Sequence, residues 1–203
     1  MYTILGATGN VGRKIVDILV KQNKQVRMVA PNADQLRPFV SKNAQAYAGD
    51  ALNTEFLSKA FEGSDAVFTM IPTNIKASNY LDYANRMGES IASALKIAKV
   101  KYVVSLSSFG ADHAEDTGPV LGLHNLEECL NRVEGLNVLH LRTGPFMEHF
   151  LMNIDTIKTR GVCSSAYRGD LKFPMIATTD VAAAAAERLV SCDFSGSSFQ
   201  YLL

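Results

Sequence analysis

The sequence lacks the features that mark several large classes of protein. Its formal net charge is +0, from 20 basic and 20 acidic side chains, so no charged surface for nucleic acid or an anionic membrane is predicted. No uninterrupted apolar stretch is long enough to span a bilayer. The N-terminus has no basic segment followed by a long apolar run, which predicts that there is no signal peptide.

Cysteine is also scarce. Cys129, Cys163 and Cys192 are widely separated, odd in number, and form neither a CxxC pair nor a cluster with histidine. This spacing argues against a zinc site and against a disulfide framework, and nothing else in the sequence suggests a metal. Because a chain without disulfides suits a reducing compartment, we expect a cytoplasmic location.

Short apolar runs alternate with helical patterns along the whole chain, without internal repeats or linkers. Strands are predicted at residues 2–5, 25–30, 44–50, 65–72, 101–108, 136–142 and 199–203, and helices around 11–19, 54–61, 79–98, 120–133 and 180–190. This alternation indicates right-handed βαβ crossovers. We therefore predict one α/β domain over residues 1–203, with a Rossmann-type, doubly wound, mostly parallel sheet flanked by helices.

The stretch GATGNVG, residues 6–12, lies between the first predicted strand and the first predicted helix. Gly6 can make a sharp turn, Gly9 lets the backbone approach a pyrophosphate, and Gly12 permits close contact between helix and strand. The helix N-terminus adds unpaired N–H groups and the positive end of a dipole. A tight turn without a ligand is the alternative, since three glycines also recur by chance. The predicted phosphate contacts are Gly6, Thr8, Gly9, Asn10, Val11 and Gly12.

Several stretches together resemble one known family. GATGNVG, then VRMVA, AGD and DAVFTMIP, resemble the NmrA-like family, whose members are atypical short-chain dehydrogenases/reductases. The later stretch HNLEECLNRVEGLNVLHLRTGPFMEHF is similar to the family's run from a helix into LRPxxFMEN, and TTDVAAAAAERL resembles its DIA helix. The resemblance covers the whole chain. It implies a C-terminal portion that helps close the substrate pocket, and that portion is expected to be reduced or missing here.

The resemblance implies NAD(P)H as the cofactor. A basic residue at the end of the second strand commonly holds the 2′-phosphate of NADP in this family, and an acidic one favours NAD. Pro31 stands there, so NADP and NAD both stay open. Arg13, Asn32 and Arg37 are possible substitutes, although each also suits a solvated surface. The further cofactor contacts that the resemblance implies are Asp50, which also suits a helix-entry cap, and Ala51, Ile71, Pro72, Thr73, Pro145 and Phe146.

Dehydrogenases of the wider superfamily use a Tyr-x-x-x-Lys pair with a serine or threonine. Aligned on RTGPF, Val120 stands at the tyrosine position and His124 at the lysine position, so the pair is absent. Similar quinone and triarylmethane dye reductases can also carry histidine there. The candidate catalytic residues are therefore His124 and Ser107, with a half-exposed helix histidine and a turn-forming serine as the alternatives. The other histidines, among them His149, have no such positional support.

Two functions from different classes follow. The first is an NAD(P)H-dependent oxidoreductase that transfers hydride to a quinone-like or dye-like electrophile, since such acceptors need no strongly activated acid. The second is a non-catalytic NAD(P)-sensing regulatory protein. A nucleotide-sugar epimerase or dehydratase is disfavoured by the missing Tyr/Lys pair. The expected partner is a small-molecule electron acceptor, with a homodimer left open.

Overall fold

The computed structural model describes residues 1–72, 74, 76–165 and 168–203. Seven strands form its sheet: β1 (Tyr2–Leu5), β2 (Val26–Ala30), β3 (Ala44–Ala48), β4 (Ala66–Thr69), β5 (Tyr102–Ser108), β6 (Asn137–Thr143) and β7 (Ser197–Leu202). The α-helices are α1 (Gly12–Lys21), α2 (Ala33–Leu36), α3 (Thr54–Phe61), α4 (Tyr80–Ile97), α5 (Leu121–Asn131), α6 (Ile154–Arg160) and α7 (Thr178–Ser191). Three 3₁₀ helices are η1 (Arg37–Phe39), η2 (Gly118–Val120) and η3 (Met147–Asn153).

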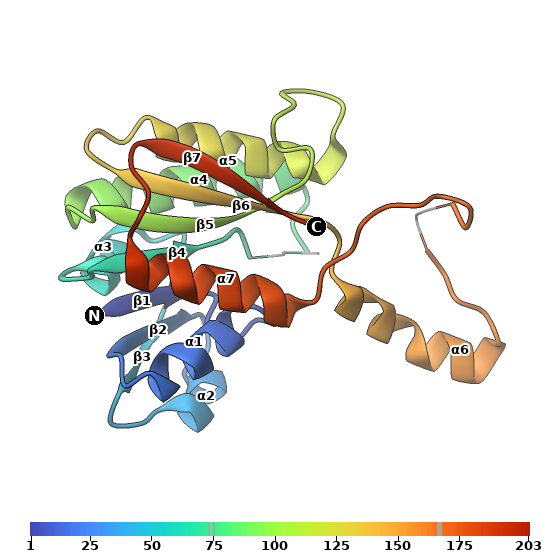
Figure 1. Cartoon of the computed structure of the whole chain (residues 1–203), viewed down its shortest axis with the longest axis horizontal. Helices are drawn as coiled ribbons and strands as arrows, with labels where there is room; N and C mark the ends of the chain where they lie inside the picture. Colours follow the sequence, from blue (N-terminus) through green and yellow to red (C-terminus); the bar gives the residue numbers. More distant parts are fainter. Residues whose placement is uncertain (73, 75, 166–167) are drawn as a thin grey trace.

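The strands lie in the order β3-β2-β1-β4-β5-β6-β7, and every pair of neighbours is parallel (Figure 1). The chain starts in the middle at β1, adds strands on one side to β3, and then crosses back to β4 on the other side. This crossing makes a topological switch point between β1 and β4, where α/β sheets bind ligands beyond the carboxyl ends of their strands. The predicted doubly wound, Rossmann-type fold is confirmed.

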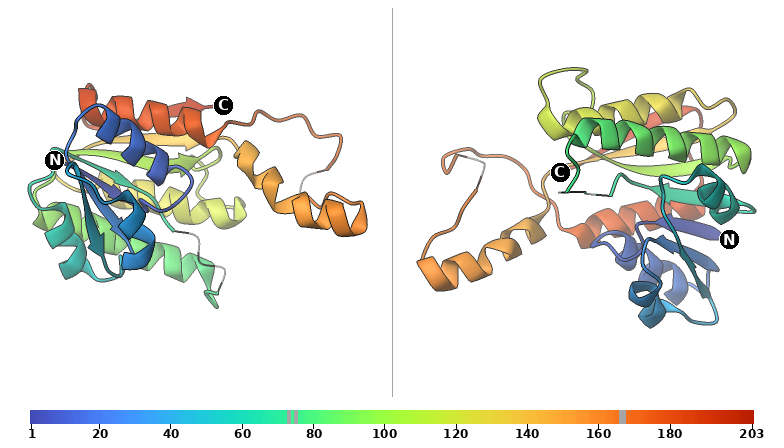
Figure 2. Two further views of the ribbon diagram at one scale, coloured as in Figure 1. Left: turned by 90° about the horizontal axis from the view of Figure 1, so that it is seen from below. Right: turned by 180° about the vertical axis from the view of Figure 1, so that it is seen from behind.

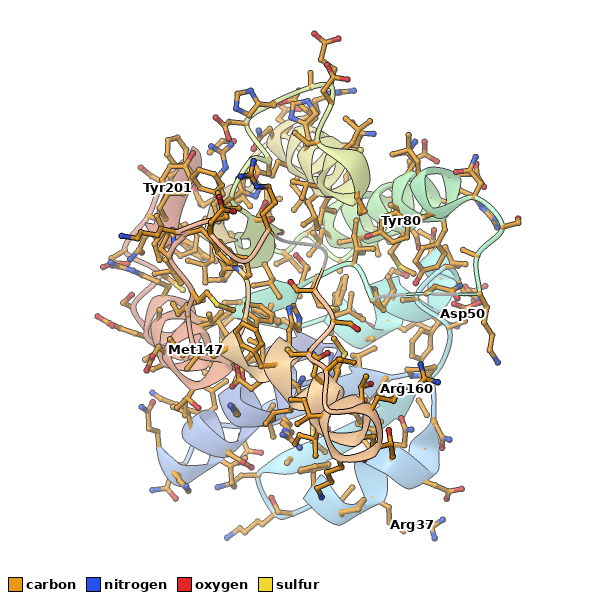
Figure 3. All side chains as sticks on the ribbon, turned by 90° about the vertical axis from the view of Figure 1, so that its right-hand side faces the viewer. Arg37, Asp50, Tyr80, Met147, Arg160 and Tyr201 are labelled. Carbon is orange, nitrogen blue, oxygen red and sulfur yellow. The ribbon has the colours of Figure 1, made fainter. Side chains whose placement is uncertain are left out.

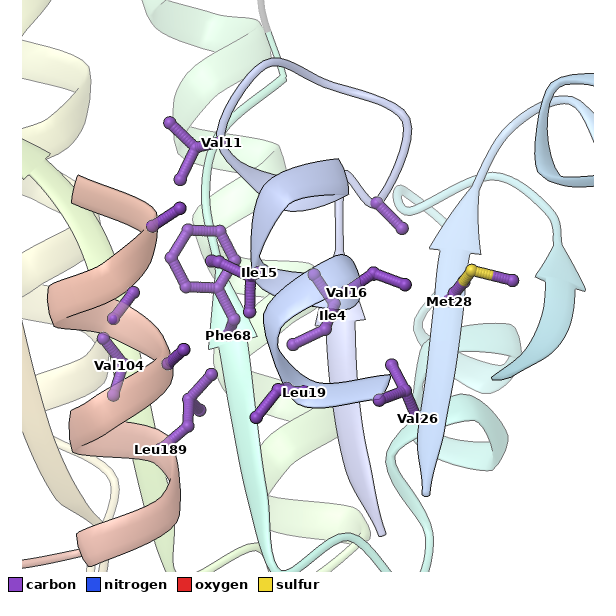
Figure 4. Close-up of a cluster of buried hydrophobic side chains, with 14 of the residues drawn as sticks. Ile4, Val11, Ile15, Val16, Leu19, Val26, Met28, Phe68, Val104 and Leu189 are labelled. Carbon is purple, nitrogen blue, oxygen red and sulfur yellow. The ribbon is translucent and has the colours of Figure 1, made fainter. Parts of the chain in front are cut away.

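Helices bury both faces of the sheet. On one face, α1 and α7 pack against each other and against the strands, and Ile15, Leu19 and Leu189 are fully buried there beside Phe68 (Figure 4). On the other face, α3, α4 and α5 bury Phe61, Ile91 and Leu130. A fully buried side chain of this kind stabilises the fold by about 1.5–3 kcal/mol. The two layers fix the strand ends that carry the candidate site.

An arm projects from this body between β6 and α7 (Figures 1 and 2). It consists of residues 147–165 and 168–177 and contains η3 and α6. Neither η3 nor α6 has a buried residue, and Leu151, Met152 and Ile157 are among its exposed apolar side chains. The arm follows β6 directly, so it stands over the carboxyl edge of the sheet.

The predicted elements are all present, with shifted ends. The strand expected at 65–72 ends at Thr69, because its ladder with β5 stops at the Thr69–Ser105 pair. The helices α2 and α6 and the 3₁₀ helices η1 and η3 were not predicted. Each has only three to seven residues and at most one buried residue, so they lack the apolar periodicity that identifies a helix.

Candidate functional site

The glycine-rich loop is tightly folded against itself. Gly6 has a φ of +74°, in the left-handed region that favours glycine. A Cβ added at Gly12 would lie 2.2 Å from the carbonyl oxygen of Gly6, an overlap between backbone atoms that no rotamer change relieves. A Cβ at Gly9 would lie 3.2 Å from the same oxygen. Gly12 is buried, whereas Gly9 is exposed, so the two glycines serve packing and ligand approach respectively.

The loop presents free hydrogen-bond donors. Within the described residues, the backbone N–H groups of Thr8, Asn10, Val11 and Gly12 donate no hydrogen bond. Helix α1 begins at Gly12 without a side-chain cap and without an acidic residue in its first turn. Free donors at the positive end of a helix dipole form an anion site. The loop therefore fits the pyrophosphate of a dinucleotide.

A cleft of about 460 Å³ lies beside this loop, at the switch point of the sheet. It collects residues from the ends of β1, β2, β4 and β5, from α4, and from the start of the arm. Its lining includes ten predicted cofactor residues: Gly6, Thr8, Gly9, Asn10, Val11, Gly12, Asp50, Ala51, Pro72 and Phe146. The side chain of Asp50 accepts a hydrogen bond from the backbone N–H of Leu52, within the turn before α3. The predicted alternative, a helix-entry cap at Asp50, is wrong, because the Asn53 side chain caps α3.

Four predicted cofactor residues within the described ranges lie elsewhere. The Asn32 side chain caps α2 by accepting from the backbone N–H of Asp34. Arg37 is 81% exposed and pairs with Asp34, and Figure 3 shows it at the lower rim, well away from Asp50. Ile71 and Pro145 line an adjoining cavity instead of the cleft. Thr73 lies outside the described residues.

Two further cavities adjoin the cleft. One, of about 310 Å³, lies at the ends of β5 and β6 and shares Met70, Leu106, Phe146 and His149 with the cleft. The other, of about 440 Å³, lies within the arm and has a mostly apolar lining that includes Phe150, Met152, Leu171, Phe173 and Met175. His149 lines all three. Space for a second ligand therefore adjoins the cleft.

Ser107 lines the cavity at β5 and β6, but its hydroxyl is engaged. It donates a hydrogen bond of 2.5 Å to Oε1 of Glu127, which is 4% exposed. Glu127 also forms a bidentate pair with Arg142, with Nη2 of the guanidinium 2.6 Å from Oε2. This hydrogen bonding from Glu127 raises the pKa of Arg142. Ser107 thus belongs to a buried ionic network beneath the cavity.

The structure does not bring His124 to the cleft. Its Nδ1 lies 2.8 Å from the carbonyl oxygen of Ala111, and its ring lines a separate surface depression between α4 and α5. Neither His124 nor Val120 lines any of the three adjoining cavities. The two candidate catalytic residues, His124 and Ser107, are therefore not placed together around a common ligand space.

Sequence reasoning missed several residues at these cavities. Tyr83 lines the cleft, and Tyr80 lines the cavity at β5 and β6. Burial raises the pKa of both phenols, so each stays protonated at neutral pH. His149 was missed because only the fold of the arm shows where its ring lies. No three His, Cys, Asp or Glu side chains within the described ranges form a group that could hold a metal ion.

The family follows from a match that covers most of the chain. The model of the NAD(P)H-binding family matches residues 6–191. The chain belongs to the NAD(P)H-binding family. The free N–H groups and the glycine cradle are the features in this structure that fit such a cofactor, and the predicted cofactor class, NAD(P)H, is confirmed.

Relatives of this NAD(P)H-binding protein agree with the predicted resemblance. It is 30% identical to the NmrA-like family domain-containing oxidoreductase ptmS of Penicillium ochrochloron over 74% of this chain and 48% of the relative. It is 24% identical to quinone oxidoreductase 2 of Escherichia coli over 98% of this chain and 68% of that one. The chain thus spans about half of the fungal relative's length. The NmrA-like resemblance is confirmed.

Solved structures show the same fold. The NADPH complex of the Escherichia coli NADPH-dependent quinone oxidoreductase superposes with a TM-score of 0.84 at 22% identity, covering 100% of this chain and 69% of that one. A triphenylmethane reductase from Citrobacter superposes with a TM-score of 0.83 at 16% identity, covering 98% and 68%. In the described part of this NAD(P)H-binding protein, no helix has the length and apolarity needed to cross a membrane.

Proposed function

We propose that the protein is an NAD(P)H-dependent oxidoreductase that transfers a hydride to a quinone-like or dye-like electrophile. One observation carries the proposal: the cofactor cleft shares His149 with two further cavities, and Phe146 with the one at β5 and β6. The larger of these is lined mostly by apolar side chains of the arm, which suits a flat aromatic acceptor. Names of relatives support the same class, since they include a quinone oxidoreductase and a triphenylmethane reductase.

Different residues around the cleft would contact different parts of the cofactor. The free N–H groups of Thr8, Asn10, Val11 and Gly12 would bind the pyrophosphate. Asp50, Ala51 and Pro72 would border the adenosine side, and Phe146 with Pro145 the nicotinamide side. The bound, reduced nicotinamide supplies the hydride. The chain's own part is to hold that ring against the acceptor and to keep water from the space between them.

The side chains around the cavities favour the reduction of electrophilic acceptors over the oxidation of alcohols. Oxidation of an alcohol needs a base for the hydroxyl proton, which the Tyr/Lys pair provides in the wider superfamily. The residues at the positions of that pattern do not provide it here, because the hydroxyl of Ser107 donates to Glu127 and His124 lies outside the cavities. Burial raises the pKa of the nearby Tyr80 phenol. A quinone or a cationic dye is electrophilic without such a base. Reduction of these acceptors is therefore the activity that the site suits best.

The alternative is a non-catalytic NAD(P) sensor. The observation in its favour is the exposed apolar surface of the arm, which includes Phe150, Leu151, Met152, Ile154 and Ile157. Apolar side chains exposed together are typical of a surface that docks a partner. Both functions need the same glycine loop, so cofactor binding does not separate them.

Turnover separates the two. The purified protein is mixed with NADH or NADPH and with a panel of quinones and triarylmethane dyes, and the absorbance of the reduced nicotinamide is followed. Loss of that absorbance with at least one acceptor supports the oxidoreductase. Measurable cofactor binding with no turnover of any acceptor would reject it in favour of the sensor.

We also propose that residues 1–203 act as one NAD(P)-binding domain and that the arm contributes to binding the acceptor. Cys129, Cys163 and Cys192 are free thiols, which suits the predicted cytoplasmic location. The expected partner is a small-molecule electron acceptor. A homodimer stays a prediction that a mass measurement in solution decides.

A further inference from the structure

His149 is the histidine whose side chain is available at the site. Its ring lines the cofactor cleft, the arm cavity and the cavity at β5 and β6. Within the described residues neither of its ring nitrogens makes a hydrogen bond or an ion pair. The other histidines are engaged: His124 contacts the Ala111 carbonyl, His140 the Asn131 side chain, and His113 lies 3.7 Å from Asp112.

The backbone around His149 is held firmly although the arm as a whole is exposed. The backbone N–H of His149 donates to the carbonyl of Phe146, and that of Met147 to the carbonyl of Ile176. The neighbouring Glu148 accepts from the backbone N–H of Thr178 at the start of α7 and from Nζ of Lys14 on α1. The His149 ring lies 5.4 Å from the Phe146 ring, centroid to centroid. These contacts keep the imidazole at the junction of the three cavities.

His149 differs from the family pattern that its stretch resembles. In the stretch FMEHF the imidazole stands where the NmrA-like pattern LRPxxFMEN has asparagine. Asparagine can donate a hydrogen bond but cannot transfer a proton at neutral pH, whereas imidazole can do both. The difference therefore adds a proton-transfer group at a position that lines the acceptor space.

We propose that His149 is the proton donor to a carbonyl acceptor. The inference rests on the proposed reductase function. One carbonyl oxygen of the quinone gains a hydride, with its two electrons, from the C–H bond of the bound nicotinamide, and the negative charge develops on the opposite carbonyl oxygen. The imidazolium of His149 transfers its N–H proton to the developing oxyanion of the quinone, a new O–H bond forms, and neutral imidazole regains a proton from water. The product is the hydroquinone, so atoms, charge and electrons balance.

Other titratable groups border the same space and define the controls. Asp50 and Tyr83 line the cleft, Tyr80 lines the cavity at β5 and β6, and Arg168, paired with Asp170, lines the arm cavity. The carboxylate of Glu148 faces Thr178 and Lys14. Tyr80 is the competing donor, because its phenol stays protonated.

Two acceptors that differ in their need for a proton test the inference. Menadione needs a hydride and a proton, whereas the crystal violet cation becomes a neutral product by accepting hydride alone. Wild type, His149→Asn, His124→Asn and Tyr80→Phe are compared with the same reduced cofactor. In His149→Asn we expect kcat/KM for menadione to fall about 10²-fold or more, and kcat/KM for crystal violet to change less than about 3-fold. His124→Asn and Tyr80→Phe should keep the wild-type ratio of the two activities.

Each other outcome has a defined meaning. An equal loss for both acceptors in His149→Asn would overturn the inference, because the ring would then only shape the cavity. A menadione-specific loss in Tyr80→Phe, with none in His149→Asn, would also overturn it and assign the proton to the phenol. If the wild type binds the cofactor but reduces neither acceptor, the proposed function itself fails.

A second readout does not depend on turnover. Ring signals of the four histidines are recorded by NMR without cofactor, and those of His149 are assigned by their loss in His149→Asn. Adding menadione should shift the His149 signals and leave those of His113, His124 and His140 in place. Unchanged His149 signals at menadione concentrations that bind the protein would contradict the inference.

Discussion

Both carboxylate oxygens of Glu148 lie 3.0 Å from the backbone nitrogen of Thr178, the first residue of α7. The Thr178 hydroxyl donates to the same carboxylate, and Lys14 Nζ lies 3.0 Å from it. One side chain on the arm thus caps a core helix and pairs with a second helix. Through this contact the residues beside His149 are tied to the body of the fold.

Substitution Glu148→Gln tests that anchor. The amide loses the ion pair with Lys14 and one of its two acceptor oxygens, so we expect a loss of about 1–2 kcal/mol in the free energy of unfolding. Partial burial by itself would raise the pKa of Glu148, but hydrogen bonds from Thr178 and Lys14 prevail and hold it at about 2. The contribution is therefore complete above the ordinary pKa of 4.5 and is lost as pH falls towards about 2.

Urea unfolding at neutral pH and at about pH 3 measures this difference. The difference in the free energy of unfolding between wild type and Glu148→Gln should be smaller at the lower pH. The control is Glu187→Gln, an exposed residue on α7, which should match wild type at both. A gap of the same size at both pH values would contradict the assigned role of the carboxylate.

Substitutions at Gly12 and Gly9 should have different effects on stability and on cofactor binding. Gly12→Ala places a Cβ 2.2 Å from the Gly6 oxygen. We therefore expect the free energy of unfolding to fall by more than about 2 kcal/mol, and cofactor binding to be lost as well. Gly9 lines the cleft and is exposed, and a Cβ added there lies 3.2 Å from the same oxygen. The Gly9→Val variant should fold but bind NADH at least about tenfold more weakly, because the isopropyl group blocks the approach of the pyrophosphate.

Thermal unfolding and the fluorescence of bound NADH measure the two effects separately. Gly169→Ala serves as the matched control, since nothing lies within 4 Å of its added Cβ and its φ is not left-handed. Cofactor binding by Gly9→Val at wild-type strength would mean that the loop is a turn without a ligand.

From the charges that line the cleft, we predict that NADH binds at least as tightly as NADPH. No lysine or arginine is among the described residues that line it, and Asp50 contributes a carboxylate. Arg37 pairs with Asp34 and the Asn32 side chain caps α2, so neither faces a 2′-phosphate. A phosphate without a cationic partner has nothing to offset its desolvation.

Equilibrium binding of the two cofactors tests this preference. Pro31→Arg, which adds a cation at the end of β2, should raise NADPH affinity about tenfold and leave NADH nearly unchanged. Pro38→Arg adds the same charge on η1, away from the cleft, and should change neither. A wild-type preference for NADPH of tenfold or more would show that another residue binds the 2′-phosphate.

The buried network beneath the acceptor space should matter more for stability than for turnover. Glu127→Ala leaves the guanidinium of Arg142 buried without its counter-charge, and we expect a loss of about 3 kcal/mol or more. Ser107→Ala removes only one donor to that carboxylate and should cost about 1 kcal/mol. Urea unfolding and kcat/KM are measured for both. A large loss of turnover with unchanged stability in Ser107→Ala would restore the catalytic role that the resemblance implies.

Local signals explain what could be predicted from the sequence. The spacing of Val11, Ile15 and Leu19 and the continuous apolar run of β4 are set by neighbours along the chain, so α1 and the buried strands were identified. The glycine loop was identified for the same reason, because strand, turn and helix are contiguous. The arm was not, because the helical turns of η3 and α6 have no buried residue and hence no apolar contrast.

The sequence by itself determined the fold class and the cofactor loop, since both depend on periodicity and on the conformational needs of glycine at residues 6–12. The tertiary structure decided which side chains share the ligand space. It placed His124 at a surface depression between α4 and α5, engaged Ser107 with Glu127, and brought His149 to the junction of three cavities. Cavities form where segments far apart in the chain pack together, and no local pattern encodes that packing.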